Sequence, residues 1–533
     1  MSAHSTSYFN SCSLDTNSDP KENIVRSLAN FIKQHHIGLI ILISVLMRLP
    51  FVLAPEIYGF QGASWRQADT ASIAHNFIAS KNILFPQINW GGNGPGYVET
   101  EFQFYPFTVS MLYQVFGEHV SIGLFVSLVF STGSLIFFYA LARNLLSSKA
   151  ATIALIFFAA SPLFTAYSVV FMPEPTVLFF YMAAFYLFMI WLQKQNFVLL
   201  LLAGVATALA ILVKPTSIHI GFVFLFLVIE KYKLRFLKDY RLWLFAIISL
   251  LPGVIWYLHA RDLYLDYGNT FGVISGGDSK FDNLRYWLSP EFYLSILEID
   301  LVGVFAIGGV FPFAIGVVVA RLNRKYRVIL YGAVSILIYY LIIPRYISFA
   351  NYYHIFALPY AALGIGLGLD WLFEPIRYGP SYGPALQKIL RHKFILSSVF
   401  VLLIALITLR AYIRYLIPSQ DPLWQCSQVV AQTVPESALV IISSTTVSEN
   451  NGVPNNYQKP QIFFYSHRYG WSLAADQHTP EQIAEYHELG GQYFVIYSQD
   501  LFQSNPQLVS YLDQTAQQVG PGIENSCAIY QFK

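Results

Sequence analysis

Long apolar runs recur along most of the chain and restrict its fold more than any other feature. A helix needs about 17–25 mainly apolar residues to cross the hydrocarbon core of a bilayer. About eleven runs approach this length: His36–Ala54, Ser121–Ala142, Ala150–Val169, Thr176–Leu192, Phe197–Val213, Ser217–Ile229, Leu242–His259, Leu301–Ala320, Val328–Ile343, Ile355–Phe373 and Phe394–Leu409. The two short runs beside Pro215 could instead form a re-entrant pair. Because charged residues make up only 12% of the 533, a soluble globular fold is excluded, and we expect an α-helical polytopic membrane protein.

Basic residues gather before the first run and then in every second connection. They are Lys21, Arg26 and Lys33; Arg143 and Lys149; Lys194; Lys231, Lys233, Arg235, Lys238 and Arg241; Arg321, Arg324, Lys325 and Arg327; and Arg377, Lys388, Arg391 and Lys393. The positive-inside rule places these segments in the cytoplasm. We therefore expect a disordered cytoplasmic N-terminus (1–35), a transmembrane module (36–417) with a large outer loop (55–120), and an extracytoplasmic domain (418–533).

The composition changes near Pro418, where apolar runs of spanning length cease. Short apolar runs then alternate with helix-like stretches, which indicates a small α/β domain. Thr479-Pro480-Glu481-Gln482 is typical of a helix start, with threonine as N-cap and proline at the first helical position. Cys426 and Cys527 lie near the two ends of this domain. An oxidising exterior would allow them to pair, but they could also remain two small unpaired hydrophobic residues.

The large outer loop contains an acidic residue in a helix-like stretch, Trp65–Ala79. Its apolar positions suit a helix along the membrane interface with its polar side towards a cavity. Asp69, on this stretch, could take a proton from an incoming hydroxyl or amine. Asp69 could instead have a capping role or form a salt bridge with Arg66 at i, i+3.

Other carboxylates lie near the predicted outer ends of the runs, where ionisable groups are costly and usually functional. Glu174 stands between two prolines, which could fix it for orienting a substrate or a metal; acidic residues also favour helix N-termini. Glu99 and Glu101 flank Thr100 in an extended segment, so both should point to the same side. Solvation of the loop is the simpler explanation for these two, above all for Glu99.

Cations and aromatic residues share the same predicted face. Lys214, Arg345 and Arg66 could hold an anionic group such as a phosphate, or could extend towards the interface as isolated charges do. Tyr352, Tyr353 and His354 open the tenth run. Aromatic belts are common at that depth, but a neighbouring asparagine and histidine make a substrate-facing role reasonable.

Several motifs that would indicate other chemistry are missing from the sequence. It shows no phosphate-binding glycine loop and no Cys/His metal spacing. A net charge of +2 gives no sign of a nucleic-acid partner. An enzyme on the outer face has no access to cytoplasmic nucleotides, so its activated substrate would have to cross the membrane on a lipid.

The chain resembles the C-superfamily of membrane glycosyltransferases (GT-C), over roughly Leu39 to Trp371. Within it, the chain is similar to protein O-mannosyltransferases and aminoarabinose transferases, above all to bacterial relatives of unknown sugar specificity. The matching stretches are Trp65–Ala71, Pro95–Phe107, Pro173-Glu174, Lys214-Pro215 and Asn351–Pro359. Many relatives have an Asp-Glu pair where this chain has Ala68-Asp69, so Asp69 alone would have to serve.

The resemblance implies an inverting transfer of a sugar from a polyprenyl-phosphate donor to a lipid, glycan or protein at the outer face of a bacterial cytoplasmic membrane. Asp69 would be the general base, and Lys214 or Arg345 would stabilise the leaving phosphate. The substrate-binding candidates are Arg66, Glu101, Glu174, Lys214, Arg345, Tyr352, Tyr353 and His354. Some relatives use a divalent metal and others use none; Glu174 and His354 are the candidate ligands here, and no other cofactor is implied.

A transporter or lipid flippase would also explain many spans and an outward cavity. That class predicts internal repeats, broken helices and ionisable groups near the midplane. The sequence shows no repeat, and its ionisable groups gather at one predicted face. A polymerase or ligase of lipid-linked glycans is a nearer alternative, since it is an enzyme on the same face.

Overall fold

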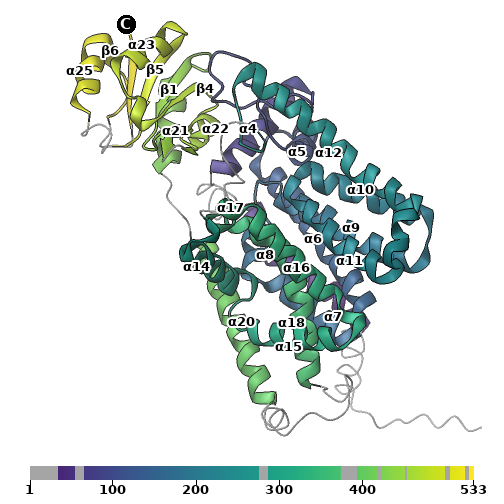
Figure 1. Ribbon diagram of the computed structural model, residues 1–533. Helices are drawn as coiled ribbons and strands as arrows, with labels where there is room; N and C mark the ends of the chain where they lie inside the picture. The colour runs from purple at the N-terminus through teal and green to yellow at the C-terminus, as the bar shows by residue number, and fades with distance from the viewer. Residues whose placement is uncertain are drawn as a thin grey trace, which may run out of the picture.

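A computed structural model describes residues 34–54, 65–274, 286–373, 393–417, 422–450, 453–498, 505–522 and 527–533. The predicted N-terminal segment up to residue 33 and the connection 374–392 lie outside these residues. A body of helices makes up most of the molecule, and a sheet-containing region adjoins one end of it (Figure 1).

Seven helices in the described part are long and apolar enough to cross a membrane. They are Gln34–Leu53 (ending in α2, Leu49–Leu53), α6 (Val120–Leu145), α9 (Glu174–Lys194), α12 (Tyr240–Tyr267), Arg324–Ile342 (η4, Arg324–Tyr326, and α16, Val328–Ile342), Asn351–Phe373 (η5, Asn351–Ala357, and α18, Leu358–Phe373) and Ser397–Arg414 in α20 (Lys393–Leu416). Shorter apolar helices are α7 (Ser148–Ala160), α10 (Phe197–Val213) and α15 (Val310–Leu322). The protein therefore has the helical membrane character predicted, whereas the count of about eleven spans stays a prediction.

Two predicted spans are divided in the structure. The run Leu301–Ala320 forms the π-helical turn η3 (Asp300–Val304) and, after residue 309, α15. The apolar run Ala150–Val169 forms α7 and then α8 (Pro162–Tyr167). Ser161 separates them with an extended backbone, and its hydroxyl accepts a hydrogen bond from the backbone N–H of Phe164. Pro162 cannot donate the hydrogen bond that would continue α7, so the second helix starts there.

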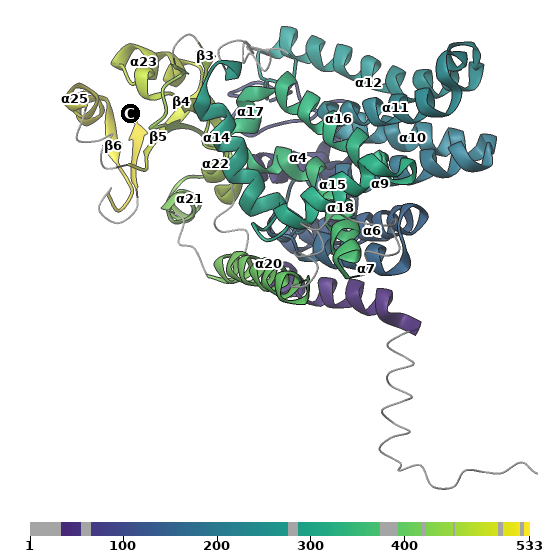
Figure 2. The ribbon, with the colours of Figure 1, turned by 60° about the horizontal axis from the view of Figure 1, so that its bottom comes forward.

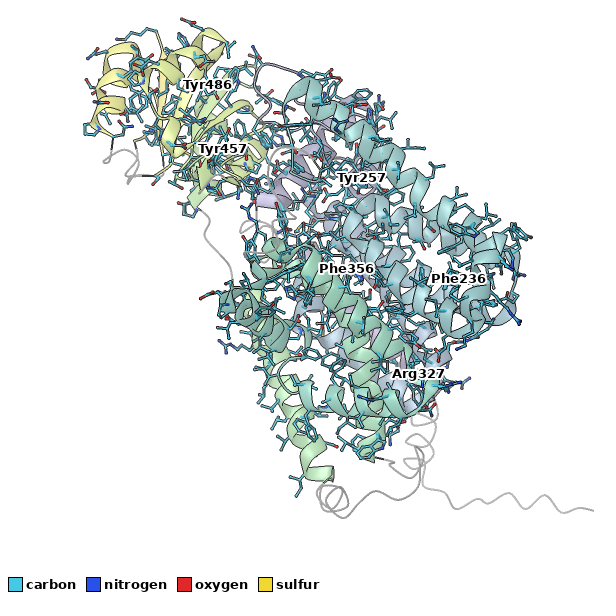
Figure 3. All side chains as sticks on the ribbon, in the orientation of Figure 1. Phe236, Tyr257, Arg327, Phe356, Tyr457 and Tyr486 are labelled. Carbon is cyan, nitrogen blue, oxygen red and sulfur yellow. A yellow bond between two sulfur atoms is a disulfide. The ribbon has the colours of Figure 1, made fainter. Side chains whose placement is uncertain are left out.

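The other helical elements connect the spans or lie near their ends. They are α4 (Trp65–Ser80), α5 (Phe104–Phe116), η1 (Pro215–His219), α11 (Ile220–Tyr232), η2 (Lys233–Lys238), α14 (Pro290–Ile299), the π-helical turn η3 (Asp300–Val304) and α17 (Pro344–Phe349). Phe236 follows α11, and Arg327 precedes α16. Both lie far from the sheet region that holds Tyr457 and Tyr486 (Figure 3). The basic connections at Phe236 and Arg327 are thus remote from the sheet, as the charge pattern predicts; orientation in a membrane stays a prediction.

Helices α9 and α18 form the centre of the helical body. The apolar window of α9 is 78% buried and that of η5–α18 is 100% buried, whereas the window in α20 is only 6% buried. Backbones of α15 and α18 approach closely, because a Cβ on Gly316 would lie 2.1 Å from the carbonyl oxygen of Gly364. Small residues allow such contact between membrane helices, which have little hydrophobic driving force between them in lipid.

Residues 422–533 form the sheet-containing region, called here the C-terminal domain. Its five-stranded sheet has the order β4-β1-β5-β7-β6, with β1 parallel to β4 and β5, and β7 antiparallel to β5 and β6. The strands are β1 (Leu439–Ser443), β4 (Tyr469–Leu473), β5 (Gly491–Ile496), β6 (Ala516–Gln518) and β7 (Ala528–Phe532), and a separate pair is β2 (Glu449–Asn450) with β3 (Val453–Pro454). The helices are α21 (Pro422–Thr433), α22 (Pro460–Ser466), η7 (Ala475–Gln477), α23 (Pro480–Glu488) and α25 (Pro506–Thr515).

Two local expectations concern this domain. Thr479 is the N-cap of α23, and its hydroxyl accepts from the backbone N–H of Gln482, so the predicted helix start is confirmed. A disulfide joins Cys426 in α21 to Cys527 before β7, with the two Cα atoms 5.4 Å apart. The structure thus contains the pairing that an oxidising exterior would allow.

The C-terminal domain shares one hydrophobic core with residues 65–120 of the predicted outer loop, called here the first outer loop. Ile73, Phe77 and Trp90 from the loop pack with buried residues of the domain, among them Val440 and Ile462. Figures 1 and 2 both show α4 beside α22. The packing follows from the apolar side of α4, which is buried against α22 instead of lying along a lipid surface.

Backbone hydrogen bonds join the same two regions. Gly92 donates to the carbonyl of Gly470 over 2.8 Å, and Gly470 donates to the carbonyl of Asn89 over 3.0 Å. Gly92 has a φ of 75°, and a Cβ there would lie 2.4 Å from the indole nitrogen of Trp471. Glycine is therefore required at the contact both by conformation and by space.

Candidate active site

Helix α4 places Asp69 in a closed environment beneath the C-terminal domain. The residue is 0% exposed. One carboxylate oxygen accepts from the indole N–H of Trp90 over 2.8 Å, and the other has no hydrogen-bond partner. Burial raises the pKa of Asp69 to about 7, against the opposing effects of the Trp90 hydrogen bond and the positive charge of Arg66. A carboxylate with this pKa is suited to accept a proton near neutral pH.

Four charged side chains from separate segments meet near α4, and we call Arg66, Glu101, Glu174 and Lys214 the charged cluster. A nitrogen of Arg66 lies 2.5 Å from a carboxylate oxygen of Glu101. Lys214 lies 2.5 Å from Glu174, and both are almost completely buried. The guanidinium of Arg66 therefore pairs with Glu101, and the salt bridge between Arg66 and Asp69 considered above is not formed.

Aromatic rings surround the two cations of the charged cluster. The ammonium nitrogen of Lys214 lies 4.6 Å from the ring centre of Tyr352 and 4.1 Å from that of Tyr353. The guanidinium of Arg66 lies 4.9 Å from the ring centre of Phe271. These distances are within the range of attraction between a cation and an aromatic face. The structure thus brings Tyr352 and Tyr353 to Lys214; their roles towards a substrate stay predictions.

Two cavities meet the charged cluster. One, of about 300 Å³, is lined by Glu101, Lys214, His219, Tyr339 and Tyr353, among others. A narrow one of about 10 Å³ is lined by residues that include Arg66, Thr70 and Glu101. Asp69 is not among the residues that line either cavity. Of the three candidate carboxylates, Glu101 lines these cavities, whereas Asp69 and Glu174 do not.

Glu174 lies at the first position of α9, so it does stand at a helix N-terminus as the charge pattern allowed. One of its oxygens binds Lys214, and the other is buried with no hydrogen-bond partner. Leaving a buried carboxylate oxygen unpaired is costly unless a ligand or an ion completes it. The geometry is thus compatible both with Glu174 as an acidic residue at a helix N-terminus and with Glu174 as a group that orients a substrate or a metal.

His354 belongs to a different polar group. Its Nδ1 lies 2.7 Å from a carboxylate oxygen of Asp300 and 2.9 Å from the hydroxyl of Tyr340, and its Nε2 lies 2.9 Å from the carbonyl oxygen of Ile347. Both ring nitrogens are therefore engaged by protein atoms. Among the described residues, the groups of three or more possible metal ligands include neither Glu174 nor His354.

Arg345, the remaining predicted cation, lies at the start of α17. It is not among the residues that line the two cavities at the charged cluster. That Arg345 stabilises a leaving phosphate stays a prediction. The geometry favours Lys214 for this role, because Lys214 lines a cavity at the charged cluster.

The expectation that loop solvation explains Glu99 is wrong. Glu99 is 0% exposed, and its carboxylate accepts from the hydroxyl of Thr270 and from the backbone N–H groups of Val273 (3.3 Å) and Ile274 (2.7 Å). Glu99 thereby fixes the segment whose Phe271, Val273 and Ile274 line the two cavities. The sequence signal that could have revealed this is the apolar pair Tyr97-Val98 directly before it.

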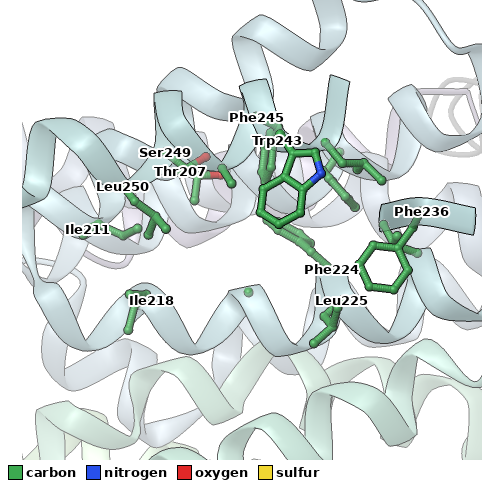
Figure 4. A pocket seen from close by; sticks show the side chains of 15 residues that line it. Thr207, Ile211, Ile218, Phe224, Leu225, Phe236, Trp243, Phe245, Ser249 and Leu250 are labelled. Atoms are coloured by element: carbon green, nitrogen blue, oxygen red, sulfur yellow. The ribbon is translucent and has the colours of Figure 1, made fainter. Parts of the chain in front are cut away.

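An apolar groove of about 240 Å³ runs along helices α10, α11 and α12 (Figure 4). Ile218 and Phe236 lie towards its two ends in the picture, with Leu225 and Trp243 between them. Ile218 also lines the cavity that contains Lys214. The groove and the charged cavity are therefore neighbours that share Ile218 as a lining residue.

Comparisons with known proteins give one family match and several similar folds. Residues 103–256 match the family described as dolichyl-phosphate-mannose-protein mannosyltransferase. This segment contains Glu174 and Lys214, whereas Arg66, Asp69 and Glu101 precede it. A comparison with curated protein sequences found no match.

Several solved structures have a similar fold. ArnT from Cupriavidus metallidurans in the apo state matches with a TM-score of 0.64 at 14% identity, over 93% of this chain and 98% of that one. ArnT bound to undecaprenyl phosphate has the same score and identity, over 93% and 97%. The Archaeoglobus fulgidus oligosaccharyltransferase tethered with an acceptor peptide matches with a TM-score of 0.58 at 12% identity, over 92% and 73%. The chain thus has a fold similar to that of these solved structures, and its residues 103–256 match the mannosyltransferase family.

Proposed function

We propose that the protein transfers a sugar from a polyprenyl-phosphate donor to an acceptor at the outer face of a membrane. The observation that supports this best is the buried charged cluster, which lines a cavity beside an apolar groove. A polyprenyl-phosphate sugar has the matching parts: an apolar chain, an anionic phosphate and a polar sugar. In the similar ArnT structure the bound molecule is undecaprenyl phosphate.

The two cations of the charged cluster are suited to the leaving phosphate. In the proposed step an acceptor oxygen or nitrogen attacks the anomeric carbon, the bond from that carbon to the phosphate oxygen breaks, and the configuration inverts. The phosphate leaves with the electron pair, and Lys214 would stabilise its negative charge. Because Lys214 is paired with Glu174, the phosphate would have to compete with that carboxylate for the ammonium group.

Two carboxylates could accept the proton of the acceptor. Asp69 has a pKa raised to about 7 and a free carboxylate oxygen, but it is enclosed. Glu101 lines the cavity next to Lys214, but it is paired with Arg66. We retain Asp69 as the proposed base because of its pKa, and its action requires a movement of neighbouring side chains that exposes its carboxylate. Glu101 is the alternative, favoured by access.

The apolar groove is the proposed place for the first isoprene units of the donor. Its walls are apolar side chains of α10, α11 and α12, and Ile218, Leu225 and Trp243 remain 52%, 39% and 56% exposed. A lipid chain lying there would extend from Ile218, next to the Lys214 cavity, towards Phe236 (Figure 4). Apolar contacts of this kind bind without selecting a sugar.

A divalent metal fits the candidate residues only in part. Glu174 offers an unpartnered oxygen, whereas both ring nitrogens of His354 are engaged by the protein. A bound metal ion would supply positive charge for the leaving phosphate. Lys214 and Arg66 can supply this charge themselves, and no step of the proposal depends on a metal.

The test combines a gene deletion with complementation. Envelope glycans and lipids of the deletion strain would be compared by mass spectrometry with strains expressing wild type, Asp69→Asn or Glu101→Gln. We expect a sugar modification to disappear and to return with wild type only. Full rescue by Asp69→Asn together with failure of Glu101→Gln would assign the base to Glu101.

A flippase is the second class to be distinguished. Accumulation of an intact lipid-linked precursor on the cytoplasmic side of the deletion strain would contradict glycosyl transfer and support lipid transport. An unchanged envelope in a strain with no other homologous gene would contradict both functions.

A further inference from the structure

Two histidines and a glutamate meet at the junction between the first outer loop and the C-terminal domain. His75 lies on α4, Glu118 follows the end of α5, and His467 caps α22. One possible ligand atom from each residue lies within 4.8 Å of those of the other two. Among the described residues these three are the group of His, Cys, Asp and Glu side chains close enough to share a metal ion.

Contacts within the group hold the side chains in place. His75 Nδ1 lies 2.9 Å from each carboxylate oxygen of Glu118. The rings of His75 and His467 have their centres 5.2 Å apart.

The backbone supports the position of His467. This residue has a φ of 52° and a ψ of 44°, a left-handed conformation that usually ends a helix with glycine. The conformation directs the chain back towards α4, where the hydroxyl of Tyr469 donates to Asn76 over 2.7 Å. His467 therefore lies where the C-terminal domain is already joined to α4 by a hydrogen bond.

The donor set identifies the class of ion. Two imidazoles and one carboxylate form a three-residue set that zinc accepts, with a fourth position left for water. Ligand atoms around tetrahedral zinc lie about 3.4 Å apart, so the separations here need only small side-chain movements. Glu118 and His467 are exposed and His75 is half-buried, which leaves room for these movements and for entry of the ion.

We propose that His75, Glu118 and His467 bind a zinc ion that fastens the C-terminal domain to helix α4. The ion would join residues 75 and 467, which are nearly 400 residues apart in sequence. A link between such distant residues closes a long loop, and links that close long loops stabilise most in theory. Its ligands lie outside the cavities of the charged cluster, so zinc binding at this position is independent of the proposed transfer reaction.

The experiment measures zinc in the purified full-length protein, prepared without a histidine tag. Metal content after dialysis would be determined by mass spectrometry, affinity by competition with a chromophoric chelator, and thermal unfolding with and without zinc. We expect one zinc per chain and an unfolding temperature that rises on adding zinc. Cobalt substitution should give visible absorption bands that report nitrogen and oxygen ligands.

Variants assign the ligands. Loss of groups that only support a metal ligand costs about 10–100-fold in affinity, so His75→Ala and His467→Ala should weaken zinc binding by about 100-fold or more. The matched control is His119→Ala, which removes an exposed histidine next to Glu118 and outside the group. It should keep wild-type affinity and the zinc-dependent rise in unfolding temperature.

Two outcomes would overturn the proposal. One is wild-type protein with no stoichiometric zinc and no thermal response; the other is equal binding by wild type and both histidine variants. Unfolding temperatures measured without metal separate loss of the site from misfolding, since a folded variant should match the metal-free wild type. The transfer reaction would remain untouched by either outcome.

Discussion

Two polar groups of the molecule, the one around His354 and the one around the charged cluster, differ in how completely their hydrogen bonds are satisfied. His354, Asp300 and Tyr340 bond to one another, and the second ring nitrogen of His354 is bound by a backbone carbonyl. Around the charged cluster, by contrast, Asp69 and Glu174 each keep one buried oxygen without a partner. Buried polar atoms are normally paired, so a complete group indicates structural support and an incomplete one indicates space for a ligand or a reaction.

The largest expected effect concerns Asp69. Asp69→Asn should reduce sugar transfer by about 10²–10⁴-fold, the usual contribution of a general base. The amide oxygen can still accept from Trp90, so folding should be preserved. Transfer would be measured in a reconstituted membrane assay with a lipid-linked sugar donor. If Asp69→Asn retained full activity, Asp69 would not be the base, and its unpaired oxygen would have no catalytic meaning.

Lys214 tests the role of charge in the same group. Lys214→Met should lower the rate by about 10²–10³-fold through loss of stabilisation of the leaving phosphate. It also leaves Glu174 buried and unpaired, which costs about 3–5 kcal/mol of stability. The double variant Lys214→Met/Glu174→Gln should recover stability but not activity. Recovery of both would show that Lys214 serves only to neutralise Glu174.

The complete group should show the opposite behaviour. His354→Ala removes the partner of Asp300 and of the Tyr340 hydroxyl, so the free energy of unfolding should fall by about 2–4 kcal/mol. The fraction that folds should transfer sugar at a rate near that of wild type. Thermal unfolding and activity per folded molecule would be measured together. A folded His354→Ala protein that has lost activity would place this residue at the substrate after all.

The smallest effect is on pH dependence. As a base, Asp69 must be ionised, so the rate should rise with pH through about 7, and this rise should be absent in Asp69→Asn. Stability should change in the other direction. The folded pKa is above the usual value of 3.8, so the folded state binds the proton more tightly and loses stability as the pH rises towards and through 7.

This pH effect is checked by thermal unfolding of wild type and Asp69→Asn at pH 5 and pH 8. Wild type should lose more stability than the variant between the two values. Equal losses would mean that the carboxyl group is not held in the closed environment described here.

The members of the charged cluster could be found from the sequence, but their pairing could not. Arg66, Glu101, Glu174 and Lys214 stand out because ionisable residues near apolar runs are costly. Which carboxylate pairs with which cation depends on how four separate segments pack, and the sequence carries no local signal of that. The helical membrane fold was predictable from the apolar runs for the same reason, since each run is a local property.

Long-range packing explains the failures. Glu99 looks like a solvated loop residue until the segment around Val273 is placed against it. The run Ala150–Val169 looks continuous because Pro162 is only one residue in an apolar stretch. His354 was grouped with Tyr352 and Tyr353 because they are adjacent in sequence, whereas its contacts are made with Asp300 and Tyr340.

The core shared by the first outer loop and the C-terminal domain limits how the protein could be recombined. Trp90 packs in that core and also holds the carboxylate of Asp69. A chimera that received the C-terminal domain of a distant homologue would therefore lose the surface that positions Trp90, even with every residue of the helical body unchanged. Domain exchange between such proteins should succeed only when the segment from Ile73 to Val98 travels with its own C-terminal domain.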